Sequence, residues 1–463
     1  MNPTPTNPRL HAIALLNAIL GQGHTLDAAQ AHASFAGTPA DAAFARHLVL
    51  SVLRHLGQLD ALLARYIDSP IASKHHPAQH ALRLGAAQLL LLDTPAHAAV
   101  HETVAAVKLT RSAALSGLAN AVLQKIAAER PKLPSPGHNL PAWWGTRLDV
   151  HYGADAARAI AAVAAQRPPL DVNLPASATM ESGARMDDCI WRLPPEHAPV
   201  DSLPGFAEGA FFVQDIAASY PARLLGDVSG QQVLDLCAAP GGKAMQLARA
   251  GANVVALDRS EQRLQRLQQN MLRTKLSVQV VTADALTWEP DEMFDAILLD
   301  APCSATGTWR RHPEVVRLAS FEKIAELAAL QRALLARAWQ WLKPGGRLVY
   351  CTCSLEPEEG EQQIAAFLAG HADAQLAPIA SLSSPLAGER GLPLQTRGGN
   401  AAEPTSPPPN PQADLTPPQG GSGPKNIPAQ CITPEGTLRT LPSMMAEQGG
   451  MDGFFAAVLV KRN

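Results

Sequence analysis

Two cysteines each follow a short apolar run that is typical of a buried β-strand. The apolar run 294–299 is followed by Asp300-Ala301-Pro302 and then by Cys303. Cys353 comes shortly after the run 347–351. A pyrimidine C5 carbon is a poor nucleophile, so its alkylation requires a thiolate to add to C6 first and the C5 proton to leave later. Two thiols at two strand ends would suit these two steps, which makes covalent chemistry a hypothesis worth testing.

A single free cysteine is most often a small buried hydrophobic residue, so residue type alone assigns neither thiol a role. Cys353 is followed by the segment 357–359, Pro-Glu-Glu, which predicts a helix start whose dipole would favour a thiolate. We therefore expect Cys353 to be the nucleophile. Cys351 is expected to point to the opposite face of the strand from Cys353 and to lie in the core.

The segment Leu234–Lys243 predicts a strand, a glycine-rich turn and a helix start. Gly241 and Gly242 would let the backbone approach a ligand, and free N–H groups at a helix start attract an anion. The segment has neither the spacing GxGxxG nor GxxxxGK[ST]. Asp258 and Asp284 end the next two predicted strands and suit a ribose diol and an adenine edge. Each feature alone is ordinary loop chemistry, but three at successive strand ends predict a nucleoside with a charged tail, for which S-adenosylmethionine is the candidate.

The loop Gly307–Glu314, which follows the first thiol, carries an aromatic residue and two guanidinium groups. Arg310, Arg311 and His312 lie next to Trp309 in this loop, and such residues suit contacts with phosphates and bases. Arginine-rich loops are also often merely solvated. The sequence leaves these two interpretations about even.

The elements that would position these residues differ along the chain. Apolar spacing predicts helices throughout 10–128, and a further helix over about 141–166. Residues 170–228 are expected to form a small segment of mixed strand and helix. From 231 onward, strands alternate with helices, which predicts a parallel sheet with helices on both faces and ligands at the carboxyl ends of its strands. Residues 372–430 are rich in Pro and Gly and are expected to form an exposed, largely disordered insertion before a last strand near the C-terminus.

Composition places limits on the class of protein. The chain has 463 residues and a formal net charge of −3, but residues 1–137 hold 11 Lys and Arg against 7 Asp and Glu, whereas the remainder holds 27 against 34. Any surface for a polyanion must therefore be local. The six cysteines form no CxxC pair, which argues against structural disulfides and a structural metal. No apolar run is long enough to span a bilayer and no secretory signal is evident, so we expect a cytoplasmic protein without a membrane partner.

These motifs together resemble the RNA cytosine-C5 methyltransferases. The resemblance rests on Leu234–Lys243, the Asp300–Cys303 turn and Thr352-Cys353-Ser354. The segments 81–100 and 117–123 resemble a NusB-type helical RNA-binding domain, which precedes the catalytic core in the Sun/Fmu group of 16S rRNA methyltransferases. The resemblance implies a multidomain fold: an all-α NusB-like domain, a small α+β RRM-like domain and an α/β Rossmann-like methyltransferase domain. The expected boundaries are 1–137, 138–228 and 229–463, with the insertion at about 372–430.

The family pattern implies a role for each matching residue. Cys353 would add to C6 of a flipped-out cytosine, Asp300 would steady N3, and Cys303 would assist loss of the C5 proton and release of Cys353. Lys243 would help to hold Asp300 and the cofactor. The family also implies one set of residues that binds S-adenosylmethionine and another that contacts RNA. Asn173 would be the RNA contact of the small domain. The expected cofactor-binding residues are Cys237, Ala238, Ala239, Pro240, Gly241, Gly242, Lys243, Asp258, Asp284 and Asp300, and the expected RNA contacts are Asn173, Arg310, Arg311 and His312.

The resemblance implies 16S rRNA, naked or in an early small subunit, as the partner of a monomeric enzyme that needs no metal. The chain departs from the family pattern at several places: Asp171 stands where Arg is common, Leu441-Pro442-Ser443 stands where a His is usual, Cys351 replaces the commoner Ala or Ser, and the 372–430 insertion is atypical. A second hypothesis is an RNA-binding ribosome-assembly factor whose catalysis is secondary or lost, although intact Cys303, Cys353 and Asp300 count against it. A third, an N-methyltransferase, would require an Asp/Asn-Pro-Pro-aromatic tetrapeptide in place of Asp300–Cys303.

Overall fold

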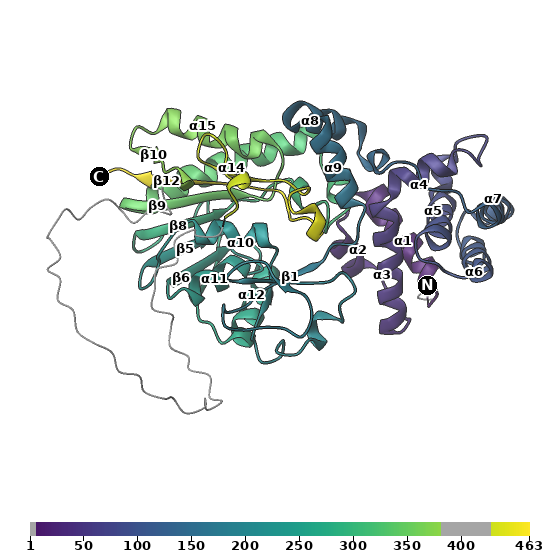
Figure 1. Ribbon diagram of the computed structural model, residues 1–463, viewed down its shortest axis with the longest axis horizontal. Coiled ribbons are helices and arrows are strands. Elements are labelled where there is room, and N and C mark those ends of the chain that lie inside the picture. Colours follow the sequence, from purple (N-terminus) through teal and green to yellow (C-terminus); the bar gives the residue numbers. More distant parts are fainter. Residues whose placement is uncertain (1–5, 381–426) are drawn as a thin grey trace, which may run out of the picture.

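The computed structural model describes residues 6–380 and 427–463. A bundle of helices forms one end of the molecule, drawn purple to blue in Figure 1. One apolar cluster, which includes Leu16, Leu48 and Leu84, holds this bundle together. Helical spacing of apolar residues along 10–128 therefore led to the right architecture. The helices are α1 (Pro8–Gln22), α2 (Leu26–His32), α3 (Pro39–Arg54), α4 (Leu56–Leu63), α5 (His76–Leu90), α6 (Ala96–Lys108) and α7 (Ser116–Glu129).

Two short helices follow the bundle, α8 (Ala142–Tyr152) and α9 (Ala154–Ala164). The helical stretch expected over about 141–166 is present, but it is divided into two helices. Gly153 between them has a φ of 84°, a left-handed conformation that ends the first helix and lets the chain turn into the second.

The segment after α9 forms a small antiparallel sheet, as expected for the mixed α+β region. Its strands have the order β2-β3-β1-β4. They are β1 (Leu170–Asn173), β2 (Ala184–Arg185), β3 (Ile190–Leu193) and β4 (Phe212–Val213), and helix α10 (Ile216–Arg223) follows.

The second half of the chain folds around a mixed sheet with the strand order β10-β12-β9-β8-β5-β6-β7, and β11 pairs with β12. Strands β5 to β9 run parallel to one another, whereas β12 runs antiparallel to β9. The strands are β5 (Gln232–Leu236), β6 (Asn253–Asp258), β7 (Gln279–Thr282), β8 (Phe294–Asp300), β9 (Leu342–Thr352), β10 (Ala374–Leu376), β11 (Leu438–Thr440) and β12 (Phe454–Lys461). The helices are α11 (Gly242–Arg249), α12 (Glu261–Thr274), α13 (Val315–Leu318), α14 (Phe321–Trp341) and α15 (Glu361–Gly370).

Helices cover both faces of this sheet, as Figure 1 shows with α14 and α15 on one side and α10, α11 and α12 on the other. Alternate residues of the strands supply the two cores. Leu234 and Leu236 of β5 belong to the cluster that includes α14 and α15, whereas Val233 belongs to the cluster that includes α10 to α12. Burial on both faces explains why these strands are continuous apolar runs.

A fourth apolar cluster joins α8 and α9 to the second half of the chain. Trp144 of α8 meets Trp309 edge to face, with ring centroids 5.2 Å apart, and Leu355 packs in the same cluster. The linker helices therefore touch the loops that follow β8 and β9, which carry the two predicted active thiols.

The expected insertion at 372–430 is partly wrong. Residues Ala374–Leu376 form strand β10, which pairs with Leu459–Lys461 at the sheet edge. Its apolar periodicity was missed because a three-residue strand is too short to show one. Residues 381–426 lie outside the described residues. Within the part of the chain that is described, no helix is long and apolar enough to cross a membrane.

Candidate active site

The parallel strands β5 to β9 end at one edge of the sheet, and the predicted site residues follow these ends. The turn 237–242 follows β5, Asp258 ends β6, and Asp284 lies two residues after β7. Asp300 ends β8, and Cys353 comes directly after β9. Because β8 lies beside β5 although two strands separate them in sequence, the chain reverses direction across the sheet at this point. Such a switch point is where open α/β sheets bind ligands.

The two thiols meet at this edge. Cys303 Sγ and Cys353 Sγ lie 3.5 Å apart, and both cysteines are free and partly exposed. Sulfur contact with Cys353, burial and the nearby Glu359 raise the pKa of Cys303 well above its ordinary value. Cys303 therefore keeps its proton at neutral pH and can donate a hydrogen bond to the sulfur of Cys353.

Asp300, the last residue of β8 and three residues before Cys303, is paired with a lysine. Lys243 Nζ donates to Asp300 Oδ2 at 2.8 Å, and the lysine is buried whereas the Asp300 side chain is 32% exposed. Burial alone would lower the pKa of Lys243, but the charge of Asp300 and the neighbouring Cys351 outweigh it, and the pKa is raised. The pair thus keeps a fixed positive charge behind a carboxylate that faces outward.

Cys351 is buried as expected, but the expectation that it points away from the site is wrong. Its Sγ lies 3.4 Å from Asp300 Oδ1. Residues two apart in a strand lie on the same face, so alternation places Cys351 on the same side as Cys353 and not on the opposite side. Strand β9 ends at Thr352, between the two cysteines.

The expected helix start after Ser354 is also wrong in detail. Pro357–Glu359 forms a single 3₁₀ turn, η6, and the α-helix α15 begins at Glu361. The argument from a helix dipole therefore does not apply to Cys353. Side-chain contacts, described below, position this loop instead.

The turn after β5 has the features that a nucleoside-containing cofactor requires. Gly241 has a φ of 105° and caps α11 without a side-chain hydrogen bond, so the N–H groups of the first helical turn are left to a ligand. A Cβ at Gly241 would lie 2.9 Å from Leu267 Cγ, so only glycine fits.

Two carboxyl groups beside this turn complete the fit. Asp258 is buried, and its oxygens accept from the N–H groups of Ala239 at 3.2 Å and Ser260 at 2.9 Å. Asp235 of β5 is fully buried, and neither of its carboxyl oxygens has a hydrogen-bond partner among the described residues. Burial raises the pKa of Asp235 to about 8, so this unpaired group holds its proton at neutral pH. Asp284 is exposed, with Oδ1 accepting from Leu286 N at 2.9 Å.

The structure contradicts two of the expected RNA contacts. Arg310 is 1% exposed and its guanidinium pairs with Asp215 and Asp452. Asn173 is 2% exposed, and its amide donates to Gln214 Oε1 at 2.8 Å. Both side chains already have their partners inside the protein and do not face a nucleic acid.

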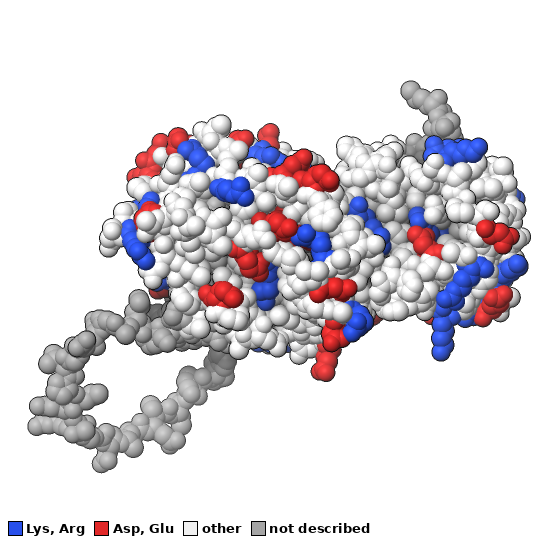
Figure 2. Space-filling model, turned by 90° about the horizontal axis from the view of Figure 1, so that it is seen from above, with Lys and Arg blue, Asp and Glu red and all other residues white. Residues whose placement is uncertain are grey.

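Arg311 and His312 remain at least partly exposed in the same loop. Arg311 is paired with Asp452 but about a third of its side chain is exposed. Burial and the charge of Arg311 lower the pKa of His312, which is therefore neutral at pH 7. Figure 2 shows acidic and basic side chains interspersed over the viewed face, without one large basic patch.

The sequence predicts no role for Glu359 beyond its place in the expected helix start at 357–359. Its side chain is buried against the loop of the first thiol, where it accepts from Ser304 N at 2.9 Å and from Gln331 Nε2 at 3.1 Å. No spacing in the sequence relates Glu359 to Ser304, since the contact joins residues 55 apart.

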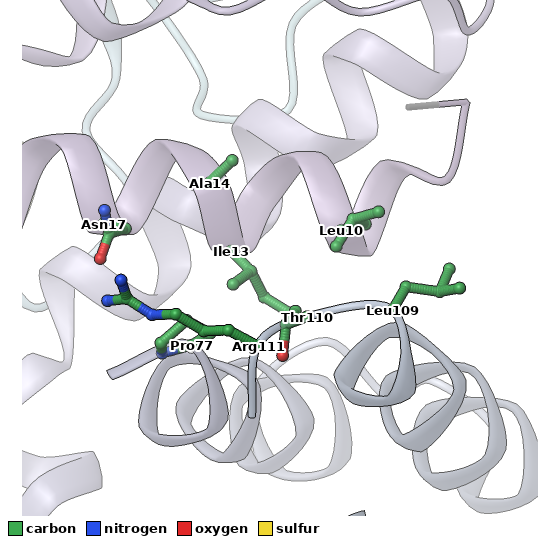
Figure 3. A pocket seen from close by; sticks show the side chains of 8 residues that line it. All are labelled: Leu10, Ile13, Ala14, Asn17, Pro77, Leu109, Thr110 and Arg111. Atoms are coloured by element: carbon green, nitrogen blue, oxygen red, sulfur yellow. The ribbon is translucent and has the colours of Figure 1, made fainter. Parts of the chain in front are cut away.

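A pocket of about 220 Å³ lies far from the thiols, in the helical bundle. Figure 3 shows Leu10, Ile13, Ala14 and Asn17 of α1 on one side of it and Pro77, Leu109, Thr110 and Arg111 on the other. Its lining is mostly apolar and holds no nucleophile. Among the described residues, no three His, Cys, Asp or Glu side chains form a group that could hold a metal ion.

Comparison with known proteins identifies relatives of both the helical domain and the domain that carries the thiols. Residues 222–404 match the family model described as 16S rRNA methyltransferase RsmB/F, and residues 6–128 match the NusB family. The ribosomal RNA small subunit methyltransferase B of Serratia proteamaculans is 36% identical over 413 residues, which cover 84% of this chain and 95% of that protein. That of Sodalis glossinidius is 37% identical over 422 residues, covering 85% and 96%.

A solved structure shows that the fold extends over the whole chain. The crystal structure of PH0851 matches with a TM-score of 0.68 and 21% sequence identity, covering 98% of this chain and 99% of that one. The matches confirm the predicted methyltransferase class, the cofactor S-adenosylmethionine and the NusB-like domain. With relatives above one third identity over most of its length, the chain belongs to the ribosomal RNA small subunit methyltransferase B family.

Proposed function

We propose that this protein methylates C5 of a cytosine in 16S rRNA through a covalent bond between Cys353 and C6. The observation that carries the proposal is the pair of thiols, 3.5 Å apart, at the same carboxyl edge of the sheet as the Asp300–Lys243 ion pair. A methyltransferase that acts on a nitrogen or an oxygen has no use for a thiol pair, because those atoms are already nucleophilic. S-adenosylmethionine supplies the methyl group.

The different environments of the two thiols support attack by Cys353. Cys303 holds its proton because contact with Cys353 and burial raise its pKa, so it can hydrogen-bond to a Cys353 thiolate and steady it. A thiol with a raised pKa also gives a stronger base when it is ionised. Cys303 then suits acceptance of the C5 proton late in the reaction, after which Cys353 leaves C6.

Asp300 supports the base during attack. Its carboxylate is partly exposed at the strand end, where a flipped-out cytosine would have to enter. Addition of sulfur to C6 places electron density on the ring, and a group that hydrogen-bonds N3 stabilises it. Lys243, buried behind Asp300, holds the carboxylate in this direction.

For the cofactor, we assign the turn Cys237–Lys243 to the methionine portion, Asp258 to the ribose and Asp284 to the adenine. Each carboxylate oxygen has two acceptor positions, so Asp258 can bind a ribose hydroxyl in addition to its backbone donors. Arg263, whose side chain is 55% exposed and lies 3.5 Å from Asp258, is the group that would move aside.

For the RNA, we assign Arg311 and His312 to contacts near the target base and the NusB-like domain to contacts farther away. The substrate is naked or early small-subunit rRNA, and the enzyme acts as a monomer in the cytoplasm. Arg311 sits in a loop whose neighbour Arg310 is fixed by buried carboxylates, so the loop is rigid at its base and accessible at Arg311.

A methyl-transfer assay tests the proposal. With tritiated S-adenosylmethionine and 16S rRNA from a strain that lacks the enzyme, the wild-type protein should produce 5-methylcytosine at one position. Cys353→Ala should produce none, and Cys303→Ala should accumulate a methylated RNA–protein adduct on a denaturing gel. Methylation at a ring or exocyclic nitrogen, or wild-type turnover by Cys353→Ala, would overturn the proposal.

A further inference from the structure

Glu359 is a buried carboxyl group that binds the loop of the first thiol. Its Oε1 accepts from Ser304 N at 2.9 Å and from Gln331 Nε2 at 3.1 Å. Its Oε2 lies 3.2 Å from Ser304 N and accepts from the Ser304 hydroxyl. Ser304 directly follows Cys303, so the backbone that carries this thiol is bonded to Glu359.

The same network reaches the second thiol. Ser304 Oγ lies 3.2 Å from Ser354 Oγ, and Ser354 directly follows Cys353. The backbone carbonyl of Glu359 accepts from Thr352 Oγ1 at 3.2 Å, and Thr352 directly precedes Cys353. Glu359 is therefore linked to the residue after Cys303 and to both neighbours of Cys353.

A carboxylate suits this position better than any neutral side chain. All the groups that point at it are donors: a backbone N–H, a hydroxyl and an amide N–H₂. A carboxylate accepts at both oxygens, whereas a glutamine would turn its own N–H₂ toward one of these donors. Burial raises the pKa of Glu359, while hydrogen bonds from Ser304 and Ser354 oppose that rise.

We propose that Glu359 is a positioning residue that holds the Cys303 thiol against Cys353 and so sets the rate at which the methylated base is released. This inference rests on the proposed function. In the release step, the Cys303 thiol first gives its proton to water; the resulting thiolate takes the C5 proton, and the C5–H electron pair becomes the C5–C6 double bond. The bond between C6 and sulfur then breaks, and its electron pair leaves with Cys353 as a thiolate. The step requires Cys303 near C5 while Cys353 is bonded to C6, which is the spacing that Glu359 fixes.

The test is the ratio of trapped adduct to released product for Glu359→Gln in a single turnover with tritiated cofactor and unmethylated 16S rRNA. Methyl transfer into the adduct should continue, whereas release should slow by roughly 10- to 100-fold, since a displacement of about 1 Å costs this much. The adduct should thus accumulate, as for Cys303→Ala. The double variant Cys303→Ala, Glu359→Gln should release no more slowly than Cys303→Ala alone.

Glu358→Gln is the matched control. It lies in the same 3₁₀ turn, but its carboxylate pairs with Arg147 of α8 at 2.6 Å and is 35% exposed. It should keep the wild-type ratio of adduct to product. Ser304→Ala, which removes one hydroxyl bond to Glu359, should raise the ratio less than Glu359→Gln, and it carries the test if Glu359→Gln does not fold.

Three results would overturn the inference: a wild-type release rate in Glu359→Gln, equal loss of adduct and product in a variant with wild-type thermal stability, or additive effects in the double variant. Failure of the proposed function is distinct from these. In that case the wild-type protein itself would yield no 5-methylcytosine.

Discussion

The loops that carry the two thiols and the turn that faces the cofactor lie at the same edge of the sheet, but different contacts hold them. The thiol half, residues 300–314 and 353–359, is fixed by side chains: Glu359, Ser304 and Arg310 are each bonded to distant segments. In the cofactor half, residues 237–243 with Asp258 and Asp284, Asp258 binds the turn through Ala239 N, and the Gly241 cap leaves the first N–H groups of α11 without a side-chain partner. Bond formation needs sulfur positions fixed within a fraction of an ångström, whereas cofactor binding needs unoccupied donors.

The largest effect on stability is expected at the base of the thiol half. Arg310→Ala leaves Asp215 and Asp452 buried without their shared partner, and breaking a buried pair in this way costs about 3–5 kcal/mol. Chemical denaturation measures the loss. Arg311→Ala is the comparison and should cost less: Asp452 loses its closer partner, but both carboxylates keep Arg310 and the Arg311 side chain is partly exposed; an equal loss in both variants would show that the two arginines are equivalent.

The next effect concerns cofactor affinity. Asp258→Asn keeps the size of the side chain but places an N–H₂ group where backbone donors and a ribose hydroxyl converge. We expect affinity for S-adenosylhomocysteine, measured by calorimetry, to fall by roughly 10- to 100-fold, about 1.4–2.8 kcal/mol. Unchanged affinity would remove Asp258 from the cofactor half.

Asp235 gives a dependence of stability on pH. Burial and the negative charges of Asp300 and Asp258 raise the pKa of Asp235 to about 8 in the folded protein, and the positive charge of Lys243 only partly opposes this rise. An unfolded Asp has a pKa near about 3.9, so the folded state holds the extra proton between these values and loses its advantage as the pH rises toward about 8. The free energy of unfolding of the cofactor-free protein should fall over this range. Asp235→Asn, which cannot ionise, should flatten the slope; an unchanged slope would contradict the prediction.

The smallest effect is expected for Asp284→Asn. Asp284 is exposed, and water competes for its contact with an adenine edge. Affinity for S-adenosylhomocysteine should fall by no more than a few-fold, about 1 kcal/mol or less, with no change in thermal stability. A loss as large as that for Asp258→Asn would mean that both carboxylates contribute equally.

The sequence predicted the fold because its signals are local. Apolar runs that end in Gly-Gly, Asp or Asp-Ala-Pro-Cys place strands, turns and thiols correctly, and the parallel order then brings the strand ends together. What it could not predict depends on contacts between distant segments. Arg310 and Arg311 are adjacent and identical in type, yet Arg310 is buried because Asp215 and Asp452, 95 and 142 residues away, lie beneath it. The role of Glu359 is hidden for the same reason.

The division of labour between the thiols is the central claim, and locating the covalent bond tests it most directly. A 16S rRNA transcript that contains 5-azacytidine should form a lasting adduct, since nitrogen at position 5 blocks normal release. After digestion, mass spectrometry should find the nucleotide on the peptide that contains Cys353, in the wild-type protein and in Cys303→Ala alike. A nucleotide on Cys303, or no adduct from an otherwise active enzyme, would contradict the account.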